Sequence, residues 1–177
     1  MSVFFQQRTI SMTLGILLSL SQSGCGGVSP VWKGACEELR KSKTLYYQQP
    51  CEYQFSPVSF LEDGPYALEF TLTYYSQIGR SELPLFVVLE DDKHSTQEFT
   101  LSIPLKKDGR DLGVPAQNEI DLTVTHLAAS SLALEEDTYY LRVFYDGERL
   151  MEAEAEGIIA LEARLYNSDV YVGSSLP

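Results

Sequence analysis

An alternation of large apolar and smaller or polar side chains runs through Tyr66-Ala67-Leu68-Glu69-Phe70-Thr71-Leu72-Thr73-Tyr74. Successive side chains of a β-strand point to opposite faces of its sheet, so this period of two predicts a strand with one face in a core. The face expected to be buried consists of Tyr66, Leu68, Phe70, Leu72 and Tyr74. The other set, Ala67, Glu69, Thr71 and Thr73, is expected to point away from that core.

Several other stretches also predict strands. Residues 83–89 are nearly all apolar, as in a central strand, and Pro84 marks the entry of that strand or an edge position. Residues 97–105 alternate, residues 120–124 form a weaker strand, and residues 139–145 lead into Asp146-Gly147, which suits a type I′ hairpin turn. An alternative for the segment after that turn, 148–156, is a helical turn, because it is rich in Glu and Ala.

A last strand is expected over residues 158–165. In the strand at 97–105 the side chains expected to face the core are Phe99, Leu101, Ile103 and Leu105. In the strand at 158–165 they are Ile159, Leu161, Ala163 and Leu165. About seven or eight short strands separated by turn signals predict an all-β fold, an antiparallel β-sandwich of immunoglobulin-like or jelly-roll-like type. We place this sandwich domain at residues 58–177.

The first 24 residues have a different character from the rest of the chain. They carry one basic residue, Arg8, no acidic residue, and an apolar run over 10–20. This run is shorter than the roughly 20 residues that span a bilayer and is typical of a signal peptide. Leu18-Ser19-Leu20-Ser21-Gln22-Ser23-Gly24-Cys25 then resembles a bacterial lipobox, although Gln22 stands where Leu or Val is preferred.

This resemblance implies that residues 1–24 are a lipoprotein signal peptide and that Cys25 becomes the acylated N-terminus, carrying a diacyl group such as palmitate on its sulfur. The alternative is an ordinary secretory signal, cut after Ser23 or Gly24, which leaves Cys25 a plain thiol.

Two cysteines then remain, Cys36 and Cys51, an even number in an exported protein, and this parity favours a disulfide between them. The alternative is a pair of buried free thiols. Residues 25–57 are rich in turn formers and are expected to be a tether followed by a lead-in that this disulfide closes, with a short helical turn over 35–41.

The formal net charge of the 177-residue chain is -12, which argues against nucleic acid as a partner. Phosphate-binding loops, dinucleotide fingerprints, nucleophile elbows and zinc-protease motifs are absent from the sequence, so we expect a non-enzymatic protein with no catalytic residues and no cofactor. His94 is expected at a solvated hairpin tip and His126 at a strand end.

Five acidic residues are expected to lie in solvated turns, with calcium binding as the alternative, so no metal site is expected. The set is Glu90, Asp91, Asp92, Asp108 and Asp111. Several tyrosines are expected to be ordinary sandwich residues, with stacking on sugars or on a protein as the alternative. They are Tyr46, Tyr47, Tyr74, Tyr75, Tyr139 and Tyr140.

Several motifs follow one another in a characteristic order: a lipid-type cysteine, the strand at 66–72, the apolar strand at 83–89, the Leu101–Leu105 strand leading to a Gly-x-x-Leu-Gly turn at Gly109–Gly113, the Thr-Tyr strand at 138–143 and the Gly-Ile strand at 157–162. This order resembles the gliding-motility lipoprotein H family of Bacteroidetes. The resemblance covers about 65–165. It implies a non-enzymatic envelope component that supports gliding or the type IX secretion machinery, with no catalytic residues to transfer.

We therefore expect a membrane-anchored lipoprotein that binds envelope proteins of a motility or secretion complex. The segment Gly26-Gly27-Val28-Ser29 lacks acidic residues, so we expect the protein to be anchored in the outer membrane and to face the periplasm. A glycan-binding lipoprotein is the alternative, and an acidic hydrolase is the third hypothesis.

Overall fold

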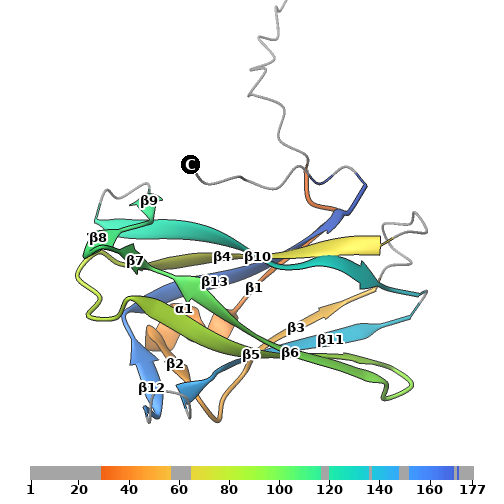
Figure 1. Ribbon diagram of the computed structural model, residues 1–177. Coiled ribbons are helices and arrows are strands. Elements are labelled where there is room, and N and C mark those ends of the chain that lie inside the picture. Colours follow the sequence, from red (N-terminus) through yellow and green to blue (C-terminus); the bar gives the residue numbers. More distant parts are fainter. Residues whose placement is uncertain are drawn as a thin grey trace, which may run out of the picture.

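Two antiparallel sheets pack face to face as a β-sandwich (Figure 1). The computed structural model describes residues 29–56, 65–116, 120–135, 137–147, 152–169 and 171. The first sheet has the strand order β1-β13-β4-β10-β9, and the second has the order β3-β11-β5-β6. The expected all-β sandwich is therefore confirmed.

The first sheet is built from β1 (Trp32–Ala35), β4 (Pro65–Tyr75), β9 (Val114–Pro115), β10 (Asp121–Ala133) and β13 (Ile158–Asn167). The second contains β3 (Cys51–Phe55), β5 (Glu82–Asp91), β6 (Thr96–Pro104) and β11 (Tyr139–Tyr145). Two small sheets pair β2 (Thr44–Tyr46) with β12 (Glu154–Glu156), and β7 (Lys106–Lys107) with β8 (Arg110–Asp111). The helix α1 spans Glu37–Ser42.

The strand β4 lies between β13 and β10, and its predicted core face is fully buried. The opposite face was expected to point away from the core, and it does, yet Ala67, Glu69 and Thr71 on it are buried as well. The Glu69 carboxylate accepts hydrogen bonds from the hydroxyls of Tyr166, at 3.1 Å, and Tyr171, at 2.8 Å. Side chains from far along the chain therefore cover an outward face that the local pattern alone assigns to solvent.

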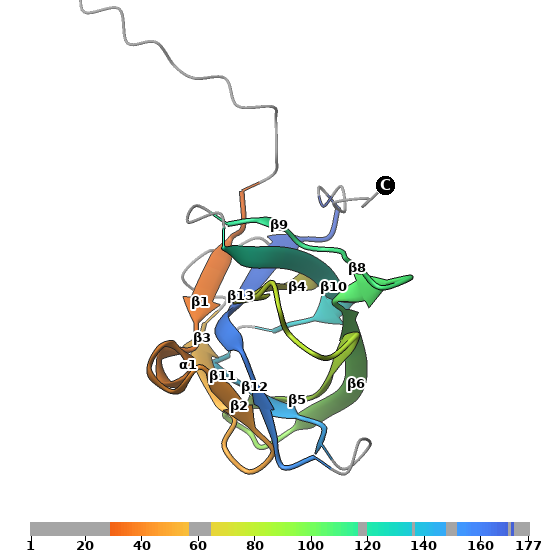
Figure 2. The ribbon, with the colours of Figure 1, turned by 90° about the vertical axis from the view of Figure 1, so that its left-hand side faces the viewer.

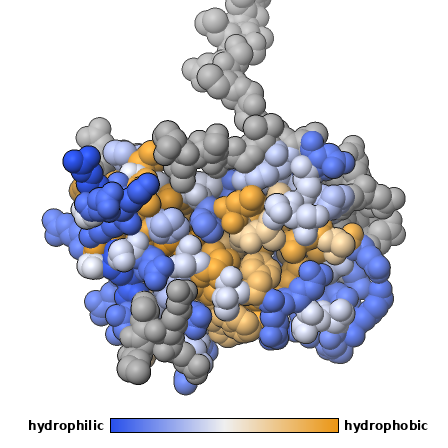
Figure 3. Space-filling view, viewed as in Figure 1, coloured by the Kyte–Doolittle hydropathy of each residue, from blue (hydrophilic) through white to orange (hydrophobic). Residues whose placement is uncertain are grey.

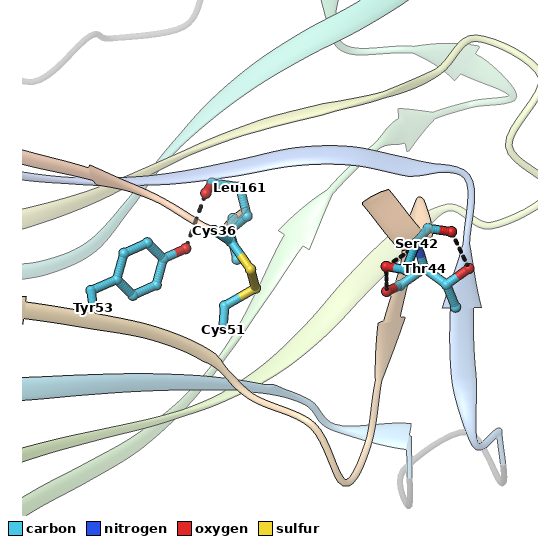
Figure 4. Close-up of a disulfide and its surroundings, with 6 residues drawn as sticks. All are labelled: Cys36, Ser42, Thr44, Cys51, Tyr53 and Leu161. Atoms are coloured by element: carbon cyan, nitrogen blue, oxygen red, sulfur yellow. Dashed lines mark hydrogen bonds between the residues drawn. A yellow bond between two sulfur atoms is a disulfide. The ribbon is translucent and has the colours of Figure 1, made fainter. Parts of the chain in front are cut away.

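One side of the sandwich is closed covalently. Figures 1 and 2 show β1 and β3 at neighbouring edges of the two sheets, with α1 beside them. The predicted disulfide joins Cys36 to Cys51, whose Cα atoms are 5.3 Å apart, and so connects the end of β1 to the start of β3 (Figure 4). Next to it, the buried Tyr53 hydroxyl donates a 3.0 Å hydrogen bond to the carbonyl of Leu161 in β13.

The lead-in contributes more to the fold than its turn-rich composition indicates. Its expected helical turn is present as α1, in which Leu39 is buried against the core. A short turn connects α1 to β2, where the Ser42 hydroxyl donates to the Thr44 carbonyl at 2.9 Å (Figure 4). The lead-in also supplies β1 and β3 as edge strands of the two sheets.

The prediction of a type I′ hairpin turn at Asp146-Gly147 is wrong. Gly147 does not have a positive φ, and after β11 the chain instead forms β12, which pairs with β2. A second Asp-Gly pair makes such a hairpin, because Asp108 and Gly109 have φ of 52° and 74° and connect β7 to β8. β11 is paired with β5 along its whole length and with β3 from Tyr139 to Val143, so a strand returning along β11 would have to displace β3.

Two other strand predictions need correction. The strand expected at 120–124 is β10, which continues to Ala133, so His126 lies within a strand and not at its end. At the start of β13 a register shift between Ile158 and Ala160 changes the alternation, so Ile158, not Ile159, is the fully buried residue. Such a bulge places one extra residue in a strand and inverts the pattern before it.

The side opposite the disulfide is open. Its borders are β6 of the second sheet and, in the first, β10 with the two-residue strand β9 paired to its Leu122 and Thr123; Figure 2 shows β6 and β10 on the side away from β1 and β3. Figure 3 views this side directly, and apolar side chains gather at its centre. The sandwich is thus closed by a covalent bond on one side and borders solvent with apolar side chains on the other.

Candidate functional site

A recess lies on the outer face of the second sheet, where β3, β11 and β5 run side by side. It encloses about 580 Å³. We call it the Arg142 recess and define it by six side chains, Glu52, Gln54, Glu90, His94, Tyr140 and Arg142.

Strand register explains why these residues meet. Tyr140 in β11 is the cross-strand partner of Gln54 in β3 and of Glu90 in β5. Arg142, two residues on, is the partner of Glu52. Because residues two apart on a strand share a face, these side chains form two adjacent rows on the outside of the sheet.

Glu90 is the centre of the polar contacts in the Arg142 recess. Its Oε2 accepts a hydrogen bond from Arg142 Nη2, and its Oε1 lies 2.8 Å from His94 Nδ1. This hydrogen bond to a carboxylate raises the pKa of His94 above its ordinary value. The Arg142 Nε is buried and has no hydrogen-bond partner among the residues described.

His94 reaches the recess from the hairpin that connects β5 to β6. The Asp91 side chain accepts hydrogen bonds from the backbone N–H groups of Lys93, at 2.9 Å, and Ser95, at 2.8 Å. This shapes a tight turn in which His94 adopts a left-handed φ of 63°. The expected hairpin-tip position of His94 is confirmed.

The electrostatic character of the recess is acidic. Glu52, Glu90, Asp91 and Asp92 line it against the single guanidinium of Arg142. Of the five acidic residues for which calcium binding is the alternative, Asp108 and Asp111 lie elsewhere, because they belong to the β7–β8 hairpin. No group of three or more His, Cys, Asp or Glu side chains that could hold a metal ion occurs within the described residues.

The tyrosines named from the sequence do not form one surface. Tyr74 and Tyr139 are core residues, whereas Tyr75 is 43% exposed and Tyr140 is 41% exposed. Tyr75 lies at the end of β4 in the first sheet, and Tyr140 lies on the second sheet, so the two exposed rings do not share a groove. A separate hollow is lined by Tyr47, Phe86 and Phe144 among others. The ring centroids of Phe86 in β5 and Phe144 in β11 are 6.0 Å apart.

The remaining sequence-derived site residues have different outcomes. Cys36 and Cys51 form the disulfide described above, whereas Cys25 and the signal segment lie outside the described residues. His126 is half-buried in β10 and faces the core, and burial lowers its pKa below the ordinary value. Sequence reasoning did not find the pairing of Glu90 with Arg142, because the two residues are 52 positions apart.

None of the helices in the described part of the chain has the length and apolar character needed to cross a membrane.

No family model and no curated protein matches the chain. Among solved structures, a likeness is found to BtGH115A, a family GH115 4-O-methyl-α-glucuronidase with specificity for decorated arabinogalactans, at 10% identity and a TM-score of 0.40. It covers 80% of this chain and 18% of that one. Dimeric latent PorU from Porphyromonas gingivalis gives 9% identity, a TM-score of 0.33, and coverage of 82% and 14%. The chain spans less than a fifth of either protein, and likeness at this level supports no statement about function.

Proposed function

We propose that this protein is a non-enzymatic lipoprotein of the cell envelope, attached through acyl chains on Cys25, which binds protein partners in support of gliding motility or the type IX secretion machinery. The lipobox-like segment before Cys25 and the order of strand and turn motifs from 66 to 162 support this proposal. Two acyl chains suffice for stable attachment, since each buried methylene contributes about 0.8 kcal/mol.

The Arg142 recess is the observation that carries the binding role. Tyr and Arg are the residue types most enriched in the energetic centres of protein interfaces, and Tyr140 and Arg142 stand together here on a strand hydrogen-bonded on both sides. A site on such a strand is held rigidly, so little conformational freedom is lost on binding. Its excess of carboxylates favours a partner surface with basic or hydroxyl groups.

The position of the recess suits a partner near the membrane. Trp32, the first residue of β1, follows Cys25 by seven positions, and an extended chain advances at most about 3.6 Å per residue. The start of β1 is therefore held within roughly 25 Å of an anchored Cys25. Trp32 contacts Phe55, which stacks on Tyr139 at 5.6 Å between ring centroids, and Tyr139 precedes Tyr140 of the recess.

Two test variants and one control variant examine the two parts of this proposal separately. Cys25→Ala is expected to release the protein from the membrane fraction, whereas Ser23→Ala, which keeps a small residue before the cut, is expected to leave it there. Arg142→Ala is expected to remain membrane-bound and to lose partners that cross-link to the wild-type protein in its own membranes. Retention of the Cys25→Ala protein in membranes would refute attachment through Cys25. An unchanged set of cross-linked partners in Arg142→Ala would refute partner binding at the Arg142 recess.

The exposed Tyr140 ring supports glycan binding as a second candidate. A sugar ring stacks on an aromatic face while its hydroxyls donate to carboxylates, and Glu52 and Glu90 lie beside Tyr140. Binding on a glycan array that Tyr140→Ala removes would favour this function, and an array without any bound glycan would exclude it.

A further inference from the structure

The strand β6 forms the edge of the second sheet and is paired along one side only. Within the residues that the structure describes, its partner is β5, in register from Glu82 opposite Pro104 to Glu90 opposite Thr96. An unpaired edge presents a row of backbone N–H and C=O groups on which another strand can form.

The register identifies which residues of β6 direct these groups outward. Asp146 N–H donates to the Pro84 carbonyl at 3.0 Å, so the backbone groups of Pro84 face β11. Hydrogen-bonded and non-hydrogen-bonded residue pairs alternate along an antiparallel ladder. Pro84 directs its carbonyl toward β11, so its pair with Ser102 of β6 is a non-hydrogen-bonded one, and Ser102 directs its backbone groups away from β5. The same alternation applies at Thr100, Glu98 and Thr96. Four residues therefore offer their N–H and C=O groups to a further strand.

The core-facing side chains of β6 are incompletely covered. Ile103 is fully buried, but Phe99 and Leu101 are only partly buried although both pack against the core. They lie on the open side of the sandwich, where Figure 3 shows apolar side chains at the surface. If a further strand paired with β6, every second side chain of that strand would point toward the core and cover Phe99 and Leu101.

The sequence of β6 lacks most of the devices that protect edge strands. It contains no Lys and its pairing with β5 shows no register shift, and its Pro104 stands only at the end. The other border of the open side differs, because β10 has register shifts between Leu127 and Ala129 and between Ala129 and Leu132. Such shifts disturb the straight ladder that an added strand needs, so β6 is the better acceptor.

We propose that β6 binds an extended segment of a partner protein as an additional strand, in which apolar side chains alternate with basic ones. The apolar side chains cover Phe99 and Leu101, and the basic ones lie on the outer face near Glu98, which is exposed. The charge of the chain, -12, favours a basic segment over a second copy of this protein, which would bring two acidic chains together. The inference adds a second contact surface to the proposed function and names the chemistry of the segment bound.

A labelled heptapeptide of alternating Lys and Val, with blocked ends, tests this directly on the purified full-length protein. We expect it to bind in a fluorescence anisotropy titration, and a peptide of the same composition with its lysines and valines in two blocks to bind at least tenfold more weakly. Thr100→Pro removes an outward N–H without breaking the ladder to β5, and it is expected to weaken binding at least tenfold. Thr100→Ala retains that N–H and is expected to bind within twofold of wild type.

Two further measurements keep the result independent of folding defects in Thr100→Pro. Bound peptide is expected to slow hydrogen exchange at the amides of Glu98, Thr100 and Ser102, while the amides of Phe99 and Leu101 keep the exchange rates of the free protein. Glu98→Lys is expected to weaken binding of the Lys-Val peptide and to strengthen binding of a Glu-Val peptide.

Equal binding of the block peptide would overturn the proposal, because attraction would then be electrostatic alone. Unchanged exchange at the outward amides, or a wild-type dimer that Thr100→Pro dissociates, would overturn it as well. The Arg142 recess is tested by Arg142→Ala in membranes and does not involve β6. If the peptide does not bind β6, the proposed function is unaffected, and if Arg142→Ala keeps all its partners, the proposal for β6 is unaffected.

Discussion

The disulfide between Cys36 and Cys51 is expected to contribute a large part of the stability of this protein. It closes a loop of sequence separation 15, and in the chain-entropy model such a loop is stabilising by about 3 kcal/mol at 25 °C. For a chain of this size that corresponds to a fall in Tm of roughly 6 to 12 °C when the bond is absent. The Cys36→Ala/Cys51→Ala double variant is therefore expected to lose about 3 kcal/mol of unfolding free energy.

Equilibrium urea unfolding followed by tryptophan fluorescence measures this loss. The chain has a single tryptophan, Trp32, and its ring contacts Tyr53 and Phe55 beside the bridge. Wild-type protein in excess reductant is the control, because it loses the bond while keeping both buried sulfur atoms. A loss below about 1 kcal/mol in both samples would refute the loop-entropy reasoning.

Three smaller perturbations follow from single contacts. Tyr53→Phe is expected to cost about 1 kcal/mol in urea unfolding, because the Leu161 carbonyl keeps its bond from the Cys36 N–H at 3.0 Å, and a loss above 3 kcal/mol would contradict this. Burial lowers the pKa of His126, so its neutral form is favoured in the fold and its contribution to stability should decline as pH falls below about 6.5; urea unfolding of His126→Gln is expected to lack this contribution, and an unchanged pH dependence would contradict it. Glu90→Gln is expected to lower the pKa of His94 toward its ordinary value in an NMR titration, and an unchanged pKa would exclude Glu90 as its cause.

Strands with a clear period of two were predicted correctly from the sequence. β4, β6, β11 and most of β13 follow this pattern, because a face that packs in the core must be apolar at every second residue, whereas β5 was predicted from its nearly continuous apolar run. The strands missed in the lead-in, β1 to β3, have three to five residues each, too few for a period to be recognised. β10 was predicted too short because Thr, Ser and Ala replace large apolar residues along it.

The functional surface was less predictable than the strands. Glu90, His94, Tyr140 and Arg142 were all visible in the sequence, but only the register between β5 and β11 brings them into one recess. The two Asp-Gly pairs illustrate the same limit. Their local turn chemistry is identical, yet only Asp108-Gly109 forms a hairpin, because β3 and β5 already occupy both sides of β11 from Tyr139 to Val143.

The sequence by itself determined the all-β class, the main strands and most of their core faces, and it favoured a disulfide between the last two cysteines, because these depend on local periodicity and on a count of thiols. Only the tertiary structure decided which strands are neighbours, that β1 and β3 close one side through the disulfide, and that β6 remains an open edge. Hydrogen bonds between strands join residues far apart in the chain, so no local pattern reveals which edge stays unpaired.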